Sequence, residues 1–282
     1  MKILRYFYII FIILLCSCGT PYIDESSTEM IIHFIDVGQG DAILIQVNNQ
    51  NMLIDSGPKE SQSNLLNYLS SLKIEKLDYI IATHPHEDHI GNMYSVIKQY
   101  DIGEFYAPKI THTSKSFERM VESLIAKNKK INVFDINTKS ISLGDKTNLY
   151  IYSPEPKDYG NNLNLYSAVF KITYGNTSFL FTGDAEKVNE EDILRNNNSI
   201  KSDVLKIAHH GSSTSTSTSF YEAVNPEVAI ISVGKDNSYN HPNTKTLELL
   251  KSKSTNIYRT DKDSTIILIS DGNTIYKYSS SK

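Results

Sequence analysis

Two hydrophobic patterns alternate along the chain from residue 30 on. Short apolar runs rich in β-branched residues predict strands at 29–38, 41–47, 51–57 and 77–83, and the intervening "NNQN" is typical of a hairpin turn. Apolar residues at helical spacing predict a helix at 63–72.

The same alternation continues to the C-terminus. Further strands are predicted at 102–108, 131–135, 148–154, 167–175, 177–184, 202–211, 226–234, 256–260, 264–270 and 273–278. Further helices are predicted at 91–100, 116–128, 187–196, 219–224 and 243–252. This order of strands and helices indicates an α/β fold.

Imidazole and carboxylate groups gather where several predicted strands end. These groups are His84, His86, Asp88, His89, Asp184, His209, His210 and, after a longer loop, His241. The carboxyl ends of strands in an α/β sheet are where ligands bind. We therefore expect the separate strand ends to meet in one site.

The spacing of these groups suits two divalent cations. His84 and His86 leave their strand at alternate positions, and neutral imidazoles at this spacing can chelate one cation. Asp88 and His89 lie on the turn into the next helix and suit a second cation. Asp184 can share its two oxygens between the cations.

A histidine from "AHHG" would complete the second site, and the residues alone leave open whether it is His209 or His210. Two neighbouring cations lower the pKa of a water between them, giving a hydroxide that attacks a phosphoryl or carbonyl centre. A donor set of nitrogen and oxygen without thiolate admits Zn²⁺ or Mn²⁺. The chemistry expected is hydrolysis.

The stretch "THPHEDHIGN" resembles the HxHxDH signature of the metallo-β-lactamase fold superfamily. "HFIDVGQGDAILIQV", "LIDSG", "FLFTGD", "LKIAHHGSSTSTS" and "ISVGKDNSYNHP" look like the hydrolase domain of ComEC-type competence proteins. The resemblance covers residues 31–270 without the membrane channel of those proteins. It implies a stand-alone hydrolase domain at 30–280 with a four-layer αββα sandwich.

The resemblance also assigns roles to residues. It implies that the metal ligands are His84, His86, Asp88, His89, Asp184 and His210, the last because it directly precedes glycine. His209 would then lie beside the site as a catalytic group, or replace His210 as ligand. Asp88 would also be catalytic, since the second cation and the nucleophile depend on it.

Other matched positions would support the site. Asp55 matches the acid that orients a ligand histidine, and Asp36, Gln39 and Asp41 would line the site floor. His241 would protonate a leaving group or grip a phosphate oxygen.

One position departs from the superfamily pattern. Many members add a histidine to the first cation before the bridging aspartate, but here that stretch reads "GNNLNLYSAVF", and His112 lies too early. The first cation would take Asn164 or a water instead. Outside the site, His33 is expected to be structural and Lys206 to face solvent.

Composition and the N-terminus add a location. The 282 residues carry a formal net charge of −4, so the protein as a whole has no electrostatic attraction for nucleic acid. Lys2, Arg5 and the apolar run 6–15 predict a secretory signal at 1–17. Ser17 and Cys18 resemble the lipobox of bacterial lipoproteins, which implies a lipid on Cys18 and a tether at 18–29.

These observations predict an extracytoplasmic lipoprotein, anchored to the membrane, that hydrolyses phosphodiester bonds, with nucleic acid as the substrate that the resemblance implies. An alternative is a phosphocholine-type or other small phosphoesterase at the cell surface. An alternative of another class is a surface lipoprotein that holds metal without catalysis. No protein partner is predicted.

Overall fold

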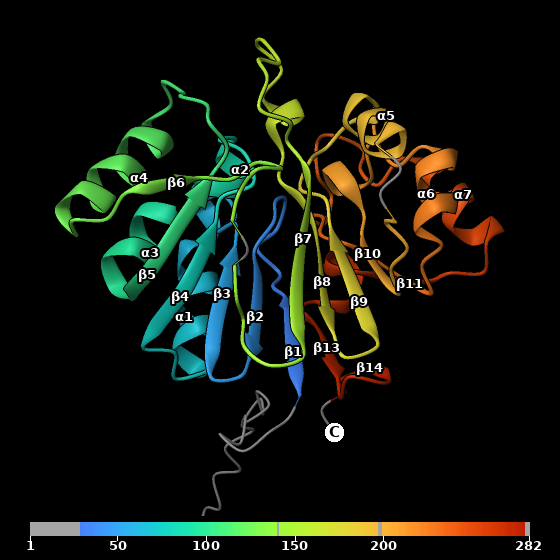
Figure 1. The fold of residues 1–282 in the computed structure, drawn as a ribbon, viewed down its shortest axis with the longest axis horizontal. Coiled ribbons are helices and arrows are strands. Elements are labelled where there is room, and N and C mark those ends of the chain that lie inside the picture. Colours follow the sequence, from blue (N-terminus) through green and yellow to red (C-terminus); the bar gives the residue numbers. More distant parts are fainter. Residues whose placement is uncertain (1–28, 140, 197–198, 280–282) are drawn as a thin grey trace, which may run out of the picture.

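The computed structural model describes residues 29–139, 141–196 and 199–279. Its strands form two sheets that pack face to face, with helices on the outer side of each sheet (Figure 1). The eight-stranded sheet has the order β14-β13-β1-β2-β3-β4-β5-β6, and the six-stranded sheet has the order β12-β11-β10-β9-β8-β7. The expected four-layer αββα sandwich is confirmed.

The predicted strands and helices are all present, with their ends shifted by a few residues. The first sheet contains β1 (Met30–Phe34), β2 (Ile43–Val47), β3 (Gln50–Ile54), β4 (Lys76–Ile81), β5 (Asp101–Ala107), β6 (Ile131–Val133), β13 (Ile266–Ser270) and β14 (Ile275–Lys277). The second sheet contains β7 (Thr147–Ser153), β8 (Val169–Tyr174), β9 (Thr177–Phe181), β10 (Val204–Lys206), β11 (Val228–Ile231) and β12 (Asn256–Arg259).

The helices are α1 (Gln62–Ser71), α2 (Glu87–Ile90), α3 (Met93–Gln99), α4 (Lys115–Ala126), α5 (Lys187–Arg195), α6 (Thr218–Val224), α7 (Thr244–Ser252) and α8 (Thr260–Asp263). Three short 3-10 turns are η1 (Lys59–Ser61), η2 (Leu163–Tyr166) and η3 (Ala208–Gly211). The single-turn elements α2 and α8 and the 3-10 turns carry too few apolar positions to show a period in the sequence.

The core has three apolar layers because both faces of the central strands are covered. On β2, Ile43 and Ile45 pack between the sheets with Phe170 of β8, while Leu44 points the other way and packs with Leu65 of α1. A third apolar layer lies between the second sheet and its helices. Strands covered on both faces read as continuous apolar runs, which is the pattern seen in the sequence.

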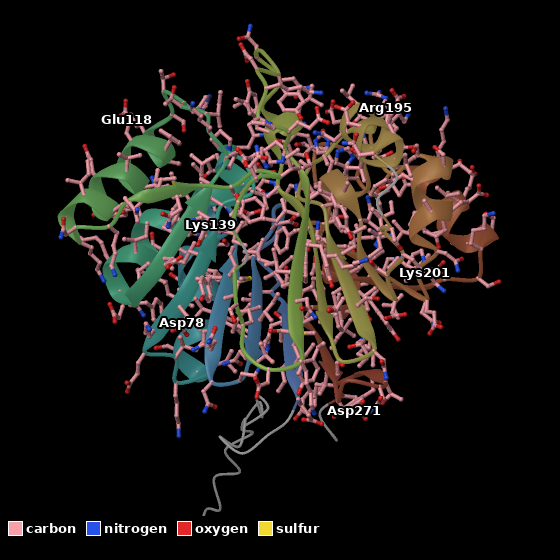
Figure 2. The ribbon with its side chains drawn as sticks, viewed as in Figure 1. Asp78, Glu118, Lys139, Arg195, Lys201 and Asp271 are labelled. Carbon is pink, nitrogen blue, oxygen red and sulfur yellow. The ribbon has the colours of Figure 1, made fainter. Side chains whose placement is uncertain are left out.

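The same topology gathers several strand ends at one end of the sandwich. β3 and β4 are parallel in the first sheet, and β9, β10 and β11 are parallel in the second. Their carboxyl ends point to the end of the sandwich where α2 and α5 lie, at the top of Figure 1. Charged side chains such as Lys201 and Glu118 lie on the outside (Figure 2).

The predicted leader cannot be compared with the fold. The signal at 1–17, Cys18 and the tether up to residue 28 lie outside the described residues, so these stay predictions. Within the described ranges, every helix is too short or too polar to cross a bilayer.

His33 lies on β1 with its side chain buried, away from the strand ends. Its Nδ1 lies 2.8 Å from the Tyr68 hydroxyl and its Nε2 lies 3.1 Å from Gln46 Oε1. Burial lowers the pKa of His33 to about 4, and the hydrogen bond to Gln46 offsets only part of this effect. The folded protein therefore holds a neutral imidazole here.

Replacing His33 with Gln should reduce the acid sensitivity of folding. An unfolded His33 takes up its proton near pH 6.5 but the folded one only near pH 4, so stability is present above this window and lost as the pH falls through it. Between pH 7 and pH 4 this group should cost about 3 kcal/mol of unfolding free energy. Denaturant titrations in EDTA at pH 7 and pH 4 measure the unfolding free energy. If wild type and H33Q lost the same amount of it between these pH values, the prediction would be contradicted.

Candidate metal centre

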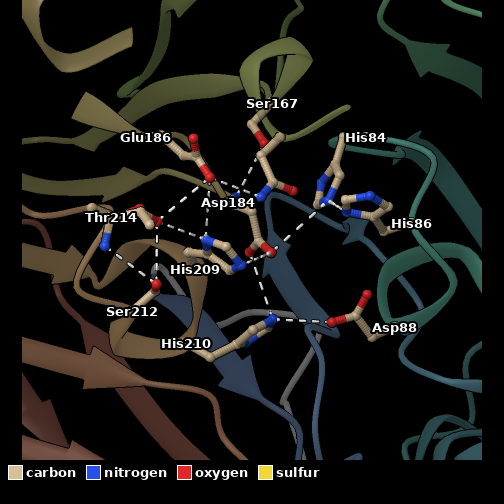
Figure 3. Close-up of polar contacts among 12 residues, drawn as sticks. His84, His86, Asp88, Ser167, Asp184, Glu186, His209, His210, Ser212 and Thr214 are labelled. Carbon is tan, nitrogen blue, oxygen red and sulfur yellow. Dashed lines mark hydrogen bonds and ion pairs between the residues drawn. The ribbon is translucent and has the colours of Figure 1, made fainter. Parts of the chain in front are cut away.

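Three segments bring the predicted side chains together at one end of the sandwich (Figure 3). The turn after β4 and the short helix α2 carry His84, His86, Asp88 and His89; Asp184 follows β9; His209 and His210 follow β10. Four of these side chains are buried almost completely, namely His84, His89, Asp184 and His210. Such burial of ionisable groups is stable only where they are paired or hold a cation.

Asp184 is shared by two clusters of possible ligand atoms. One contains His84, His86 and Asp184, the other contains Asp88, His89, Asp184 and His210, and within each the donor atoms lie within 4.8 Å of one another. Asp184 Oδ2 lies 3.9 Å from His84 Nε2. Asp184 Oδ1 lies 3.2 Å from His89 Nε2 and 3.6 Å from His210 Nε2. The two oxygens of one carboxylate thus serve different clusters.

Several atoms of these clusters fit a bound cation. Among the described residues, the buried atoms His89 Nε2, His210 Nε2 and Asp184 Oδ1 have no hydrogen-bond partner. Buried polar atoms are nearly always paired, so three unpaired atoms from residues of one cluster call for a ligand. Imidazole nitrogen and carboxylate oxygen are ligands that Zn²⁺ and related divalent ions accept.

The backbone after β10 separates the two neighbouring histidines. His209 and His210 both adopt left-handed backbone angles, with φ of 50° and 53°, which is rare for consecutive residues with side chains. His210 points inward, where its Nδ1 donates to the Ser232 carbonyl at 2.9 Å and its Nε2 lies 3.3 Å from Asp88 Oδ2. The structure therefore places His210 among the possible ligands.

His209 lies at the rim instead. Its side chain is 23% exposed, and its Nε2 lies 3.7 Å from Asp184 Oδ2. Its Nδ1 lies 3.2 Å from the Thr214 hydroxyl. The ring of His241 contacts the His209 ring at a centroid distance of 5.7 Å. Two imidazoles thus stand beside the clusters with access to solvent.

Asp55 holds one of the cluster histidines in place. Its Oδ2 accepts a hydrogen bond from His89 Nδ1 at 2.7 Å. Thr83 fixes the carboxylate through its backbone N–H at 2.7 Å and its hydroxyl at 2.6 Å. Because Nδ1 is engaged, Nε2 is the ring nitrogen of His89 that faces Asp184. A carboxylate behind a ligand histidine is a common arrangement in metal sites.

Asp41 and Lys206 form a second support, behind His210. Lys206 Nζ lies 2.9 Å from Asp41 Oδ2, and both side chains are buried. Asp41 Oδ1 lies 3.6 Å from His210 Nδ1. The expectation that Lys206 faces solvent is wrong, because β10 is an inner strand and both faces of its sheet are covered.

The other residues expected at the site floor lie apart from the clusters. Asp36 Oδ1 accepts from the Gly38 N–H at 3.1 Å, and its own N–H donates to the Thr265 hydroxyl. Gln39 Oε1 accepts from the Gly234 N–H at 3.1 Å. Asp36 and Gln39 therefore shape the loops around the site, and of the expected floor residues Asp41 lies closest to a candidate ligand.

Glu186 is a site residue that sequence reasoning missed. Its carboxylate accepts hydrogen bonds from Asn162 Nδ2 at 2.9 Å and Asn164 Nδ2 at 3.1 Å. Glu186 Oε1 also lies 3.8 Å from His209 Nδ1. Asn164, expected as a weak ligand, thus holds this carboxylate through its nitrogen, while its buried Oδ1 has no hydrogen-bond partner within the described ranges. The available signal was the position of Glu186, two residues after Asp184.

Burial and charge set opposite protonation tendencies in the centre. Burial lowers the pKa of His84 well below its ordinary value, which leaves the neutral form that binds cations. For His89 burial acts in the same direction, but the carboxylates of Asp184 and Asp55 outweigh it and raise the pKa well above the ordinary value. For Asp184 burial would raise the pKa, but the imidazoles of His89 and His210 hold it well below the ordinary value. The carboxylates therefore favour positive charge at His89, whereas burial disfavours it at His84.

Comparisons with known proteins agree with this geometry. A family model described as the metallo-beta-lactamase superfamily matches residues 35–235. ComE operon protein 3 of Bacillus subtilis is 31% identical over 258 residues, which is 85% of this chain and 33% of that protein. Recombination protein 2 of Haemophilus influenzae is 30% identical over 245 residues, 85% of this chain and 29% of that protein. The chain spans about a third of the length of these curated relatives.

Solved structures share the fold at low sequence identity. The metallo-beta-lactamase fold protein YhfI from Bacillus subtilis has a TM-score of 0.58 at 13% identity, covering 86% of this chain and 100% of that one. CmlA, a diiron beta-hydroxylase from Streptomyces venezuelae, has a TM-score of 0.55 at 15% identity, covering 85% and 53%. At these identities the comparison concerns the fold alone.

Replacing Lys206 with Met should destabilise the protein strongly, because it leaves the Asp41 carboxylate buried without its partner. The expected loss is about 3–5 kcal/mol of unfolding free energy. Lys201→Met, an exposed control at a nearby position, should change it by less than about 0.5 kcal/mol. Adding Asp41→Asn to K206M should restore part of the loss. Equal denaturation midpoints for K206M and K201M would contradict the importance of this pair.

Proposed function

The chain belongs to the metallo-beta-lactamase superfamily, and from this premise we propose that it is a two-cation hydrolase of phosphodiester bonds in nucleic acid. The single observation that carries the proposal is the sharing of Asp184 between two clusters of histidine and aspartate donors. A carboxylate in that position suits a pair of divalent cations, Zn²⁺ or Mn²⁺.

The residues divide into those that would hold the cations and those that face the substrate. His84, His86 and Asp184 would hold one cation, and Asp88, His89, Asp184 and His210 would hold the other. When bound, such a pair lowers the pKa of a water molecule and neutralises charge that develops on phosphoryl oxygens. Asp55 orients the imidazole of His89 and the Ser232 carbonyl orients that of His210, while Asp41 Oδ1 lies 3.6 Å from His210 Nδ1.

His209 and His241 are placed to act on the substrate. Both rings stand at the rim, and burial lowers the pKa of His241. Imidazoles at this position can donate a proton to a departing oxygen or a hydrogen bond to a phosphate oxygen. Glu186 and Thr214 lie against the His209 ring on its Nδ1 side. Nε2 of His209, on the side facing Asp184, is the atom for either role.

Nucleic acid is the proposed substrate on the strength of the relatives. The relatives that match the largest share of this chain are named for competence and recombination, which are processes that involve DNA. The formal net charge of −4 weighs against it, because phosphate contacts normally come from a basic surface. A small phosphoester, such as a phosphocholine ester at the cell surface, is therefore the second candidate.

We also propose that the protein is an extracytoplasmic lipoprotein, because "LCSC" follows an apolar run behind Lys2 and Arg5. If so, Cys18→Ala should abolish incorporation of labelled fatty acid and move the protein from the membrane fraction to the soluble fraction. The control is Cys16→Ala, which should leave both unchanged. Membrane retention and fatty-acid labelling that persist in C18A would contradict a lipid at that cysteine.

The activity is tested with the full chain purified in detergent and supplied with Mn²⁺ or Zn²⁺. A single-stranded oligonucleotide, bis-p-nitrophenyl phosphate and p-nitrophenyl phosphorylcholine are offered separately. We expect cleavage of the first two, abolished by EDTA, and a fall in kcat/KM of about a hundredfold or more in Asp88→Asn, because a cation contributes several kcal/mol of charge stabilisation. Asp88 is partly exposed, so D88N should still fold.

Asp271→Asn is the matched control, since Asp271 lies at the opposite end of the sandwich (Figure 2). If the small esters are hydrolysed and the oligonucleotide stays intact, the nuclease proposal is replaced by the small-phosphoesterase proposal. Bound metal without hydrolysis of any substrate in the wild type would favour the metal-holding lipoprotein.

A further inference from the structure

A row of four rings leads from the buried centre to the surface. His210 contacts His209 at a centroid distance of 6.2 Å, and His209 contacts His241 at 5.7 Å. His241 in turn stacks on Tyr239, with centroids 5.9 Å apart and ring planes 25° apart. The row begins at a candidate ligand and ends on a tyrosine that is 65% exposed.

Tyr239 is presented by a loop that is fixed from within. Asn237 Nδ2 donates to the carbonyls of Gly234 at 2.9 Å and His241 at 2.7 Å. Asn237 Oδ1 accepts from the backbone N–H of Tyr239 at 3.2 Å and of His241 at 3.0 Å. One side chain thus ties both ends of the loop, so the backbone that carries the exposed ring is held in place before any ligand arrives. A preorganised group loses little entropy when it binds.

We propose that Tyr239 is a stacking platform for a nucleobase of single-stranded nucleic acid whose scissile phosphate lies at the metal centre. This inference rests on the proposed nuclease function and names the form of its substrate. His241 packs beside the Tyr239 ring in an offset arrangement, and the exposed side of the Tyr239 ring can stack with a planar base. Proteins that bind single strands stack successive bases on aromatic side chains, a contact that any base can make because every base has a π-face.

The geometry favours an unpaired base over the other ligands considered. A base inside a duplex is stacked on both faces, so it offers no face to a single ring, whereas an unpaired base does. A choline group is bound by cages of several aromatic rings, and Tyr239 offers one face only. Stacking also does not depend on surface charge, which reconciles a nucleic-acid substrate with a net charge of −4.

The test compares Tyr239→Ala with two ligands of equal phosphate count, a twelve-residue oligo-dT and the same chain made entirely of abasic residues. Binding of each fluorescently labelled ligand to the full chain is followed by its fluorescence anisotropy in EDTA. KM and kcat are measured with Mn²⁺. We expect Y239A to weaken oligo-dT binding and raise its KM by about five- to a hundredfold, the range of one base–aromatic stack. The abasic chain should bind wild type and Y239A alike.

Two variants serve as controls. Tyr239→Phe keeps the ring and should stay within about twofold of the wild type. Tyr276→Ala removes another exposed tyrosine, on β14 at the far end of the sandwich, and should change nothing. Melting temperatures of all variants establish that the loop change leaves the fold intact.

The outcomes separate this inference from the proposed function. If oligo-dT is cleaved but Y239A equals the wild type, or if Y239A loses both ligands equally, the platform is wrong while the nuclease stands. A defect of Y239A confined to p-nitrophenyl phosphorylcholine would assign Tyr239 to choline and overturn the base platform. If the wild type neither binds nor cleaves oligo-dT, both proposals fall.

Discussion

A single buried carboxylate joins the two halves of this protein. Asp184 stands at the end of β9 in the second sheet, and its oxygens lie within 3.9 Å of imidazoles that the first sheet supplies after β4. Burying so many ionisable groups is costly in a medium of low polarity unless charge and hydrogen bonds balance. The sandwich therefore closes around a centre that is complete only when both sheets contribute to it.

Charged groups also lie behind the imidazoles, on the side away from Asp184. Asp55 engages Nδ1 of His89, and the Asp41–Lys206 pair lies behind His210. Nδ1 of His89 donates to Asp55 and Nδ1 of His210 donates to the Ser232 carbonyl, which leaves Nε2 of both rings facing Asp184. The support residues come from the ends of β2, β3 and β10 or the loops beside them, so the precision of the centre depends on sheet register as much as on the ligands.

Charge falls off and aromatic character rises from the centre to the surface. The inner groups are carboxylates and imidazoles that are mostly buried, the rim carries His209 and His241, and the outermost ring is Tyr239. Under the proposed function, the groups that would act on a phosphoryl centre and the ring that would stack its base occupy successive positions.

The sequence by itself determined the α/β order and the ligand types, because apolar periodicity and the HxHxDH spacing are local properties. It predicted His84 to His89 and Asp184 as a metal centre, a grouping that the structure reproduces. Only the tertiary structure decided that His210 points inward and His209 outward. This follows from the left-handed backbone angles of both residues after β10, which ends at Lys206 rather than at 211 as the sequence predicted. It also decided that Lys206 is buried, because strand position within a sheet depends on contacts distant in sequence.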